Sequence, residues 1–245
     1  MENFAGYGNP AAPYWYVGME EGGDREGEFI SKRLDAWDVR GGSAFEDLME
    51  YHRVTDLGSF FHLQPKLQTT WKQLIRITLV AERRPFDTDA IREYQALKLG
   101  RRNGETALLE LFSLPVSALA CWPYDKLSNL PNLQTRELYR RTLAPRRVQM
   151  IKNLIDQHVP EFVVMYGTTY LTYWEQIHGG TFLPDGNFLR GRRGSTEMIL
   201  IRHPAARGSS NLYFEEVGRR LGDLRNAARQ GRGEKAPAFA AALGT

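Results

Sequence analysis

Two short apolar segments, far apart in the chain, constrain the fold most strongly, because each stops abruptly at polar side chains that can do chemistry. The first, residues 14–18, runs into the carboxylates of Glu20 and Glu21. The second, residues 198–202, delivers His203. Parallel α/β sheets place ligand sites at the carboxyl ends of their strands. The sequence therefore predicts that a carboxylate and a histidine meet in one crevice, although many such strand ends carry no chemistry.

Apolar segments of strand length alternate along the chain with segments of helical periodicity. We expect strands at residues 14–18, 107–111, 162–167 and 198–202. We expect helices at residues 26–37, 44–51, 69–82, 87–99, 143–158, 168–177 and 211–229, and a loop at 123–135. This alternation predicts an α/β fold with three α/β/α layers and a four-stranded, mostly parallel sheet. It forms one domain over residues 1–229, followed by a flexible tail at 230–245.

The composition narrows the class of protein. The 245 residues are 42% hydrophobic and hold no apolar run long enough for a membrane helix. The N-terminus lacks the basic and apolar parts of a secretory signal, so we expect a cytoplasmic monomer that does not contact membranes. The single cysteine, Cys121, excludes an intrachain disulfide and a four-thiolate cluster, and its apolar neighbours predict a buried, unreactive thiol. The five histidines are scattered, so we expect neither a metal nor a cofactor.

Arginine dominates the positive charge. The chain has 25 Arg and seven Lys, with a formal net charge of +3. Arginine suits bidentate phosphate contacts, although a GC-rich coding sequence would also give this composition. A glycine-flanked basic stretch, expected to be a loop just before the 198–202 strand, contains Arg190, Arg192 and Arg193. Basic residues beside a predicted site favour a polyanionic partner, here DNA, whose phosphates these three would contact.

With the strands placed in this way, residues 14–228 resemble the uracil-DNA glycosylase superfamily. The first motif of that family is a strand ending in G-Q-D-P-Y-H, G-M/I-N-P-G or G-E-A-P-G, and V-G-M-E-E-G at residues 17–22 occupies its place. The last motif is a strand ending in H-P-S before a loop that wedges into DNA, and R-H-P-A-A-R-G-S-S at 202–210 is similar to it. The resemblance implies a uracil-DNA glycosylase-like fold and hydrolysis of the N-glycosidic bond of a flipped-out base.

The resemblance also implies catalytic roles for two residues. Glu20 falls where one branch of the family has its catalytic aspartate, and it would orient a water or stabilise the sugar cation. His203 would bond to the pyrimidine O2 or to the charge of the departing base. No lysine lies in either motif, which predicts a monofunctional enzyme without Schiff-base chemistry. The DNA wedge, with Arg207 as the inserting side chain, is expected to comprise Ala205, Ala206, Arg207, Ser209 and Ser210.

The predicted base pocket departs from the family pattern. Its expected lining is Met19, Glu21, Gly22, Glu110 and Phe112. Glu21 replaces the usual proline, and Gly22 stands where a bulky tyrosine excludes substituents on C5, so a C5 group should fit. The asparagine that reads the base is missing. Depending on the strand register, Glu110 or Phe112 takes its place. A carboxylate there could accept a hydrogen bond from the cytosine amine, or Glu110 is only a surface residue.

Three functions remain open on the sequence alone. The first is a glycosylase that removes a C5-modified cytosine, such as the glucosylated hydroxymethylcytosine of phage DNA, with a role in antiphage defence. The second is a repair glycosylase for uracil or another deaminated base. The third is a catalytically silent DNA-binding relative, because both the proline and the asparagine of the family motifs are missing.

Overall fold

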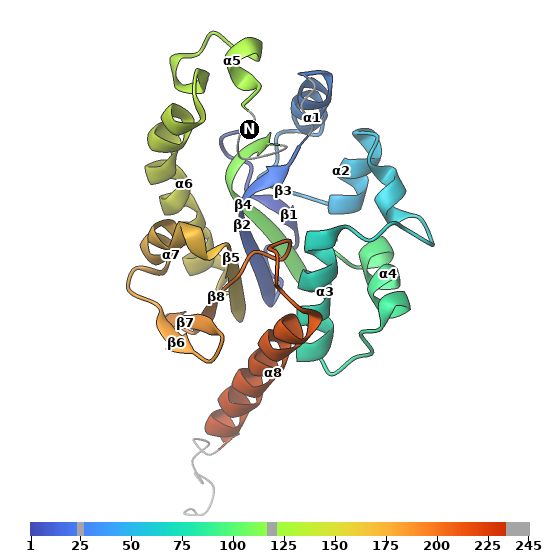
Figure 1. Ribbon diagram of the computed structural model, residues 1–245, viewed down its shortest axis with the longest axis vertical. Coiled ribbons are helices and arrows are strands. Elements are labelled where there is room, and N and C mark those ends of the chain that lie inside the picture. Colours follow the sequence, from blue (N-terminus) through green and yellow to red (C-terminus); the bar gives the residue numbers. More distant parts are fainter. Residues whose placement is uncertain (24–26, 117–121, 234–245) are drawn as a thin grey trace, which may run out of the picture.

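The computed structural model describes residues 1–23, 27–116 and 122–233. Within them, eight strands form one mixed sheet in the order β3-β1-β4-β2-β5-β8-β7-β6 (Figure 1). The strands are β1 (Gly6–Gly8), β2 (Tyr14–Gly22), β3 (Phe45–Glu46), β4 (Thr106–Val116), β5 (Phe162–Tyr166), β6 (Leu183–Asp185), β7 (Phe188–Arg193) and β8 (Thr196–Ile201).

The centre of the sheet is parallel. Strands β4, β2, β5 and β8 lie side by side in that order and run in the same direction. Their carboxyl ends therefore share one edge of the sheet, which is where α/β sheets bind ligands. The outer pairings β1/β4, β7/β8 and β6/β7 are antiparallel, and β3 pairs with β1 in parallel.

The expected α/β fold is confirmed, but the expected sheet is wrong in size and direction. Four additional strands flank the parallel centre, and they make the sheet mixed. Strands β1, β3 and β6 are two or three residues long, so they are too short to show a period of two in the sequence. Their strand geometry is set by pairing with the sheet and not by local pattern.

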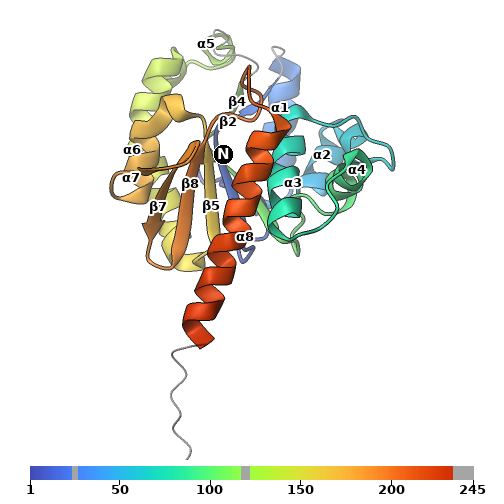
Figure 2. The same ribbon diagram turned by 60° about the horizontal axis from the view of Figure 1, so that its bottom comes forward.

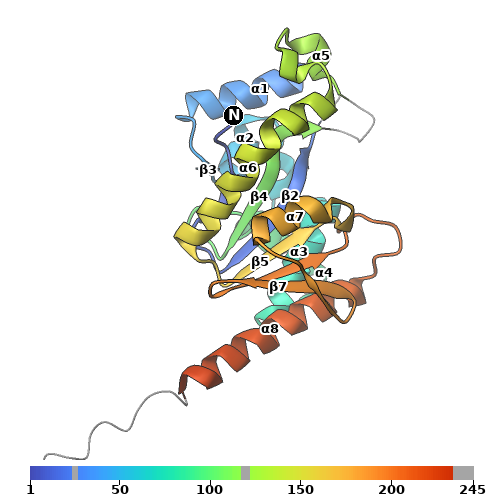
Figure 3. The ribbon, with the colours of Figure 1, turned by 90° about the vertical axis from the view of Figure 1, so that its left-hand side faces the viewer.

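Helices cover both faces of the sheet. They are α1 (Gly27–Val39), α2 (Leu48–Val54), α3 (Thr69–Ala81), α4 (Thr88–Leu97), α5 (Tyr124–Leu127), α6 (Arg136–His158), α7 (Leu171–His178) and α8 (Asn211–Gly233). Helices α6 and α7 pack on one face, for example through Ile151 and Trp174. Helices α3 and α8 pack on the other, through Leu74 and Val217, and run beside each other in Figure 2. Figure 3 shows α5 and the start of α6 beyond the sheet edge, next to α1.

The helix starts that were predicted correctly from the sequence carry side chains that cap the first turn. Asp87 accepts the backbone N–H groups of Asp89 and Ala90 and so starts α4. Gln68 accepts from the N–H of Trp71 at the start of α3. Helix α6 begins seven residues earlier than expected, because Thr135 caps it by accepting from Leu138. A capping threonine is a signal that was readable in the sequence.

Four further expectations are corrected by the structure. Residues 44–51 hold the short strand β3 and then α2, which the Asp47 side chain caps. The expected loop at 123–135 contains α5 and a 3-10 helix at Pro131–Leu133. Helix α8 continues to Gly233, into the segment expected to be a flexible tail. Strand β2 extends to Gly22, so Glu20 and Glu21 lie on the strand and not beyond it.

Two expectations fall on residues that the structure does not describe. Cys121, expected as a buried thiol, lies outside the described residues, and so does the segment 234–245 of the expected tail. Over the part of the chain that is described, no helix is both long and apolar enough to cross a membrane.

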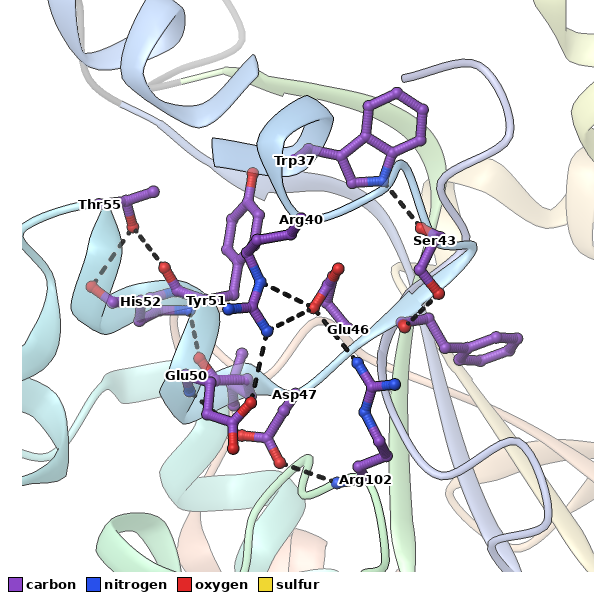
Figure 4. Close-up of polar contacts among 12 residues, drawn as sticks. Trp37, Arg40, Ser43, Glu46, Asp47, Glu50, Tyr51, His52, Thr55 and Arg102 are labelled. Atoms are coloured by element: carbon purple, nitrogen blue, oxygen red, sulfur yellow. Dashed lines mark hydrogen bonds and ion pairs between the residues drawn. The ribbon is translucent and has the colours of Figure 1, made fainter. Parts of the chain in front are cut away.

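Two buried carboxylates, Glu46 and Asp47, lie at the end of β3, the edge strand of the sheet. We call them the β3 cluster (Figure 4). Glu46 accepts two hydrogen bonds from Arg40, at 3.0 and 2.9 Å, and lies 3.6 Å from Arg102. Asp47 pairs with Arg101 at 2.8 Å and caps α2. This cluster ties α1, β3, α2 and the turn before β4 together.

Candidate functional site

A pocket of about 710 Å³ opens at the edge where the parallel strands end. Its volume is in the range of small-molecule sites. The ends of β2, β4 and β5 and the residue His203 after β8 all contribute to it. Its lining includes five aromatic side chains from separate elements, which are Phe29, Phe60, Trp71, Tyr166 and Tyr170. The predicted meeting of β2 carboxylates with His203 in one pocket is therefore present in the structure.

Glu20 lines this pocket from β2, and two arginines of α6 hold it. Arg136 forms a close ion pair with the carboxylate, and Arg140 donates to its Oε1 at 3.1 Å. These arginines lie one helical turn apart, so both reach the same carboxylate from one face of α6. Arg140 also stacks over the ring of Tyr170, 5.5 Å from its centroid. The carboxylate of Glu20 is thus fixed in position at the pocket wall.

Glu21 points away from α6, to the helix layer that contains α1 and α2. It pairs closely with Arg33 of α1, accepts from the hydroxyl of Tyr7 at 3.0 Å, and lies 3.6 Å from His52 Nε2. Burial by itself would raise the pKa of Glu21, but Arg33 and His52 outweigh it and hold the pKa at about 2. Glu21 is therefore an ionised anchor between β2, α1 and α2.

Glu110 lies beside them on β4, directly opposite Gly18 of β2. Its Oε1 accepts from the hydroxyl of Tyr166 at 3.3 Å, and its buried Oε2 has no hydrogen-bond partner among the described residues. A Cβ at Gly18 would collide with both the Tyr166 hydroxyl and the Glu110 carboxylate, so the absence of a side chain there makes room for this pair. Burial and the nearby charge of Glu21 raise the pKa of Glu110 well above its usual range.

The backbone of β4 is held at this point by Arg147 from α6. Its guanidinium, fully buried, donates to the carbonyl oxygens of Glu110 at 2.8 Å and Leu111 at 2.7 Å. Burial lowers the pKa of Arg147 to about 10, so it stays charged at neutral pH. Phe112, the alternative to Glu110 as the residue that reads a base, is fully buried against Tyr139 and Tyr173 and does not line the pocket. The register therefore turns Glu110, and not Phe112, to the pocket.

The remaining predicted pocket residues, Met19 and Gly22, also line the pocket. Met19 is buried in the core between β2 and α6. Gly22 is exposed at the end of β2, and a Cβ there would meet nothing within 4 Å. The space beside Gly22 is thus open.

His203 lies at the pocket rim, with its ring edge-on to Tyr166 at a centroid distance of 5.4 Å. Its Nδ1 accepts the backbone N–H of Ala205 at 3.1 Å. Burial lowers the pKa of His203, which favours the neutral ring. On a neutral ring with Nδ1 as acceptor, the proton is on Nε2, so this nitrogen can donate to a ligand.

The predicted wedge follows His203 as an exposed turn between β8 and α8, at the same end of the sheet as the pocket (Figure 2). Ala206 donates its N–H to the His203 carbonyl at 2.9 Å, and Arg207 is exposed. The Ser209 hydroxyl is buried with no partner among the described residues, and Ser210 accepts from the N–H of Tyr213 in the first turn of α8. Beside this turn lies a second hollow of about 460 Å³, whose lining includes Arg202 and Arg219.

The basic stretch before the His203 strand is not a loop. Residues 188–193 form β7, which is antiparallel to β8 and places Arg193 opposite Thr196, at the amino end of β8. The hairpin thus carries the stretch away from the pocket edge. Arg190 and Arg192 pair with Glu197 at 3.0 and 3.6 Å, and Arg193 forms two 2.6 Å bonds to Asp156.

Several residues of the site were not expected from the sequence. Arg33 stands on the apolar face of the expected 26–37 helix, and a lone arginine on such a face indicates a buried ion pair. Arg136 and Arg140 carried a weaker signal, their spacing of four residues. Tyr166 ends β5, the position at which parallel strands present ligand contacts. Trp71 gave no sign that its ring faces a pocket and not the core.

The described residues contain no group of three or more His, Cys, Asp or Glu side chains arranged to hold a metal ion. The site instead offers aromatic faces, two arginine- or histidine-paired carboxylates, one carboxyl group without a cation and a histidine donor. The chain matches no protein-family model and no curated protein.

Proposed function

We propose that this protein is a monofunctional DNA glycosylase that flips a base into the pocket and hydrolyses its N-glycosidic bond. The observation that carries this proposal is the meeting of Glu20 and His203 around one aromatic-lined pocket at the shared edge of four parallel strands. Both residues stand at the strand ends where the motifs resemble those of the uracil-DNA glycosylase superfamily. The proposal is for a monomer that acts on DNA in the cytoplasm.

Each of the two residues has a distinct role in this mechanism. As the bond from C1′ to the base breaks, its electron pair goes to the base and positive charge develops on the sugar. Glu20, fixed by Arg136 and Arg140, stabilises that charge. The His203 Nε2–H donates to the pyrimidine O2, where negative charge collects. Water then bonds to C1′, and its proton ends on the released base.

The preferred substrate is a cytosine that carries a bulky C5 group, such as the glucosylated hydroxymethylcytosine of phage DNA, which implies a role in antiphage defence. The open space beside Gly22 supports this choice. The aromatic walls supplied by Phe29, Phe60 and Trp71 offer flat apolar faces for the base and its substituent.

DNA contacts are proposed for the turn after His203 and not for β7. Arg207 is exposed on that turn, and Arg202 and Arg219 line the hollow next to it. Ala205, Ala206, Ser209 and Ser210 would form the body of a wedge that fills the gap left by the flipped base. Unstacking a base costs a few kcal/mol, which these contacts must offset.

Two alternative functions fit the same site. A repair glycosylase for uracil or another deaminated base would use the same Glu20 and His203 geometry. A catalytically silent DNA-binding relative is supported by the double arginine grip on Glu20, because a carboxylate held in two ion pairs is a poor general base.

A base-release assay separates these three functions. Duplex and single-stranded oligonucleotides containing uracil, cytosine or glucosylated hydroxymethylcytosine are incubated with the protein, and abasic sites are detected by alkaline cleavage. We expect release of the glucosylated base. Release of uracil alone would favour the repair function, and binding without any release would favour the silent relative.

The Gly22→Tyr variant tests the C5 space directly, with Gly22→Ala as its matched control. The backbone at Gly22 is in a region open to any residue, and an alanine Cβ meets nothing, so Gly22→Ala should keep its activity. Gly22→Tyr should lose activity on the C5-bulky base by steric conflict. Equal loss in both variants would report a backbone requirement at residue 22 and not the size of the pocket, whereas full activity of Gly22→Tyr would show that the pocket does not extend past Gly22.

A further inference from the structure

Three carboxylates line the pocket from the adjacent strands β2 and β4, and they differ in the cations that pair with them. Glu20 pairs with Arg136 and Arg140, and Glu21 pairs with Arg33. Among the described residues, Glu110 forms no ion pair, and a tyrosine hydroxyl is its sole side-chain partner. Among the described residues, Glu110 is thus the pocket carboxylate that has no ion-pair partner of its own.

Of the groups that face Glu110, the two carboxylates oppose its ionisation, whereas the Tyr166 hydroxyl and Arg33 favour it. From β2, across the pair with Gly18, the like charges of Glu21 and Glu20 act on it, while Arg33 of α1 is engaged by Glu21. From β5 it receives the Tyr166 hydroxyl. From α6, Arg147 bonds to the backbone carbonyl of residue 110 and not to its carboxylate. A buried carboxyl group with two carboxylate neighbours and no cation of its own is most stable when protonated.

We propose that Glu110 is a neutral carboxylic acid in the pocket, and that its unpartnered Oε2 donates a hydrogen bond to a ring acceptor of the flipped base. The second half of this proposal rests on the proposed glycosylase function, whereas the protonation of Glu110 does not. Because Oε1 already accepts from Tyr166, the carboxyl proton belongs on Oε2.

This assignment changes which atom of the base Glu110 recognises. An ionised carboxylate could only accept a hydrogen bond, as from the exocyclic amine of cytosine. A protonated Oε2 instead requires an acceptor, which cytosine offers at N3 and uracil at O4. Glu110 then selects for a pyrimidine that has a hydrogen-bond acceptor on this edge. The space beside Gly22 discriminates between pyrimidines that differ in their C5 substituents.

Infrared difference spectroscopy of the protein without DNA tests the protonation. The spectrum of wild type minus Glu110→Gln at neutral pH should contain the carbonyl band of a protonated carboxylic acid. A Tyr166→Phe variant should keep this band to a higher pH than wild type, because the Tyr166 hydroxyl stabilises the ionised form. A difference spectrum that shows only carboxylate bands at neutral pH would overturn the proposal.

Base release by two Glu110 variants tests the donor role. Glu110→Gln can turn its carbonyl to the Tyr166 hydroxyl and place its NH₂ donor where Oε2 lies, so it should retain activity within about tenfold. Glu110→Leu has no donor and should lose about a hundredfold or more. Wild-type activity should fall at alkaline pH as Glu110 ionises, and Glu110→Gln should lack this fall.

If Glu110→Gln is as inactive as Glu110→Leu, and wild-type activity rises with pH, the ionised carboxylate is the reading group and the donor role is wrong. If wild type releases no base from any substrate while the acid band is present, the glycosylase function fails and the protonation of Glu110 stands. The two failures are therefore distinguishable.

Discussion

The β3 cluster and the pocket carboxylates are two groups of buried or partly buried acidic side chains on or next to strands of the same sheet, and their carboxylates differ in their partners. In the β3 cluster, Glu46 has two arginine partners (Figure 4). Asp47 combines an ion pair with Arg101 and a helix cap. In the pocket, Glu20 and Glu21 are paired, but the Oε2 atom of Glu110 is buried with no partner among the described residues.

This difference in hydrogen-bond and ion-pair partners distinguishes carboxylates that stabilise the fold from a carboxyl group that we propose binds a ligand. A buried polar group without a partner costs about 1–3 kcal/mol, so it persists where a ligand or a reaction needs it. The β3 cluster needs no ligand because its own arginines complete it. On our proposal for Glu110, the flipped base supplies the hydrogen-bond partner that its Oε2 lacks.

The largest expected effect comes from Glu20. Glu20→Gln should lower base release by about 10²- to 10⁴-fold, because the charge acts on the transition state, while DNA binding stays nearly unchanged. Single-turnover release and a DNA-binding titration measure the two quantities. A loss smaller than about tenfold would remove Glu20 from the mechanism and make its ion pairs structural, like those of Glu46.

Glu46→Gln is the matched variant in the other cluster. It removes the same charge from a buried, arginine-paired position, so it should lower the free energy of unfolding by about 1–3 kcal/mol. Base release per folded molecule should not change. Denaturant unfolding measures the stability and the release assay measures the activity. A loss of base release in Glu46→Gln would show that the two groups of carboxylates do not differ in function.

The second expected effect is the pH dependence that Glu21 gives to stability. Its folded pKa of about 2 lies below the value of 4.5 for a free side chain, so its contribution is full above pH 4.5 and is lost as the pH falls towards 2. The contribution is on the order of 3 kcal/mol. Wild type should therefore exceed Glu21→Gln in stability by this amount at neutral pH, and the gap should close in acid. A gap that is independent of pH would argue against an ionised Glu21.

Glu110 should act with the opposite sign. Its folded pKa is raised, so wild type loses stability as the pH rises through the unfolded pKa, and Glu110→Gln avoids this loss. We expect Glu110→Gln to have a higher melting temperature than wild type at neutral pH and a smaller advantage near pH 4. A variant that is less stable than wild type at neutral pH would place Glu110 with the satisfied carboxylates of the β3 cluster.

The smallest expected effect concerns the arginines of β7. Because Arg190, Arg192 and Arg193 are paired and run away from the pocket edge, their triple alanine variant should leave the salt dependence of DNA binding unchanged. Arg207→Ala should lower the slope by about 0.9 on duplex DNA. A shallower salt dependence of DNA binding in the triple variant would show that β7 contacts DNA phosphates.

The central part of the fold could be read from the sequence because its signals are local. Strands β2 and β5 and the capped helices α3 and α4 follow from apolar runs, periodicity and caps, although the expected end of β2 was four residues too early. The short flanking strands could not be read, because their hydrogen bonds depend on neighbours that are distant in sequence. The prediction that residues 190–193 lie near the site failed for the same reason. These residues precede the His203 strand directly in sequence, but the antiparallel pairing of β7 with β8 carries them away from the pocket.

The sequence by itself determined that carboxylates and a histidine stand at the ends of parallel strands, because side-chain type and strand pattern are encoded residue by residue. Only the tertiary structure decided what each carboxylate does. Arg136 and Arg140 come to Glu20 from α6, and Arg33 comes to Glu21 from α1, whereas no such cation among the described residues reaches Glu110. The charge state of a buried acid depends on its partners and its burial, and both are properties of packing.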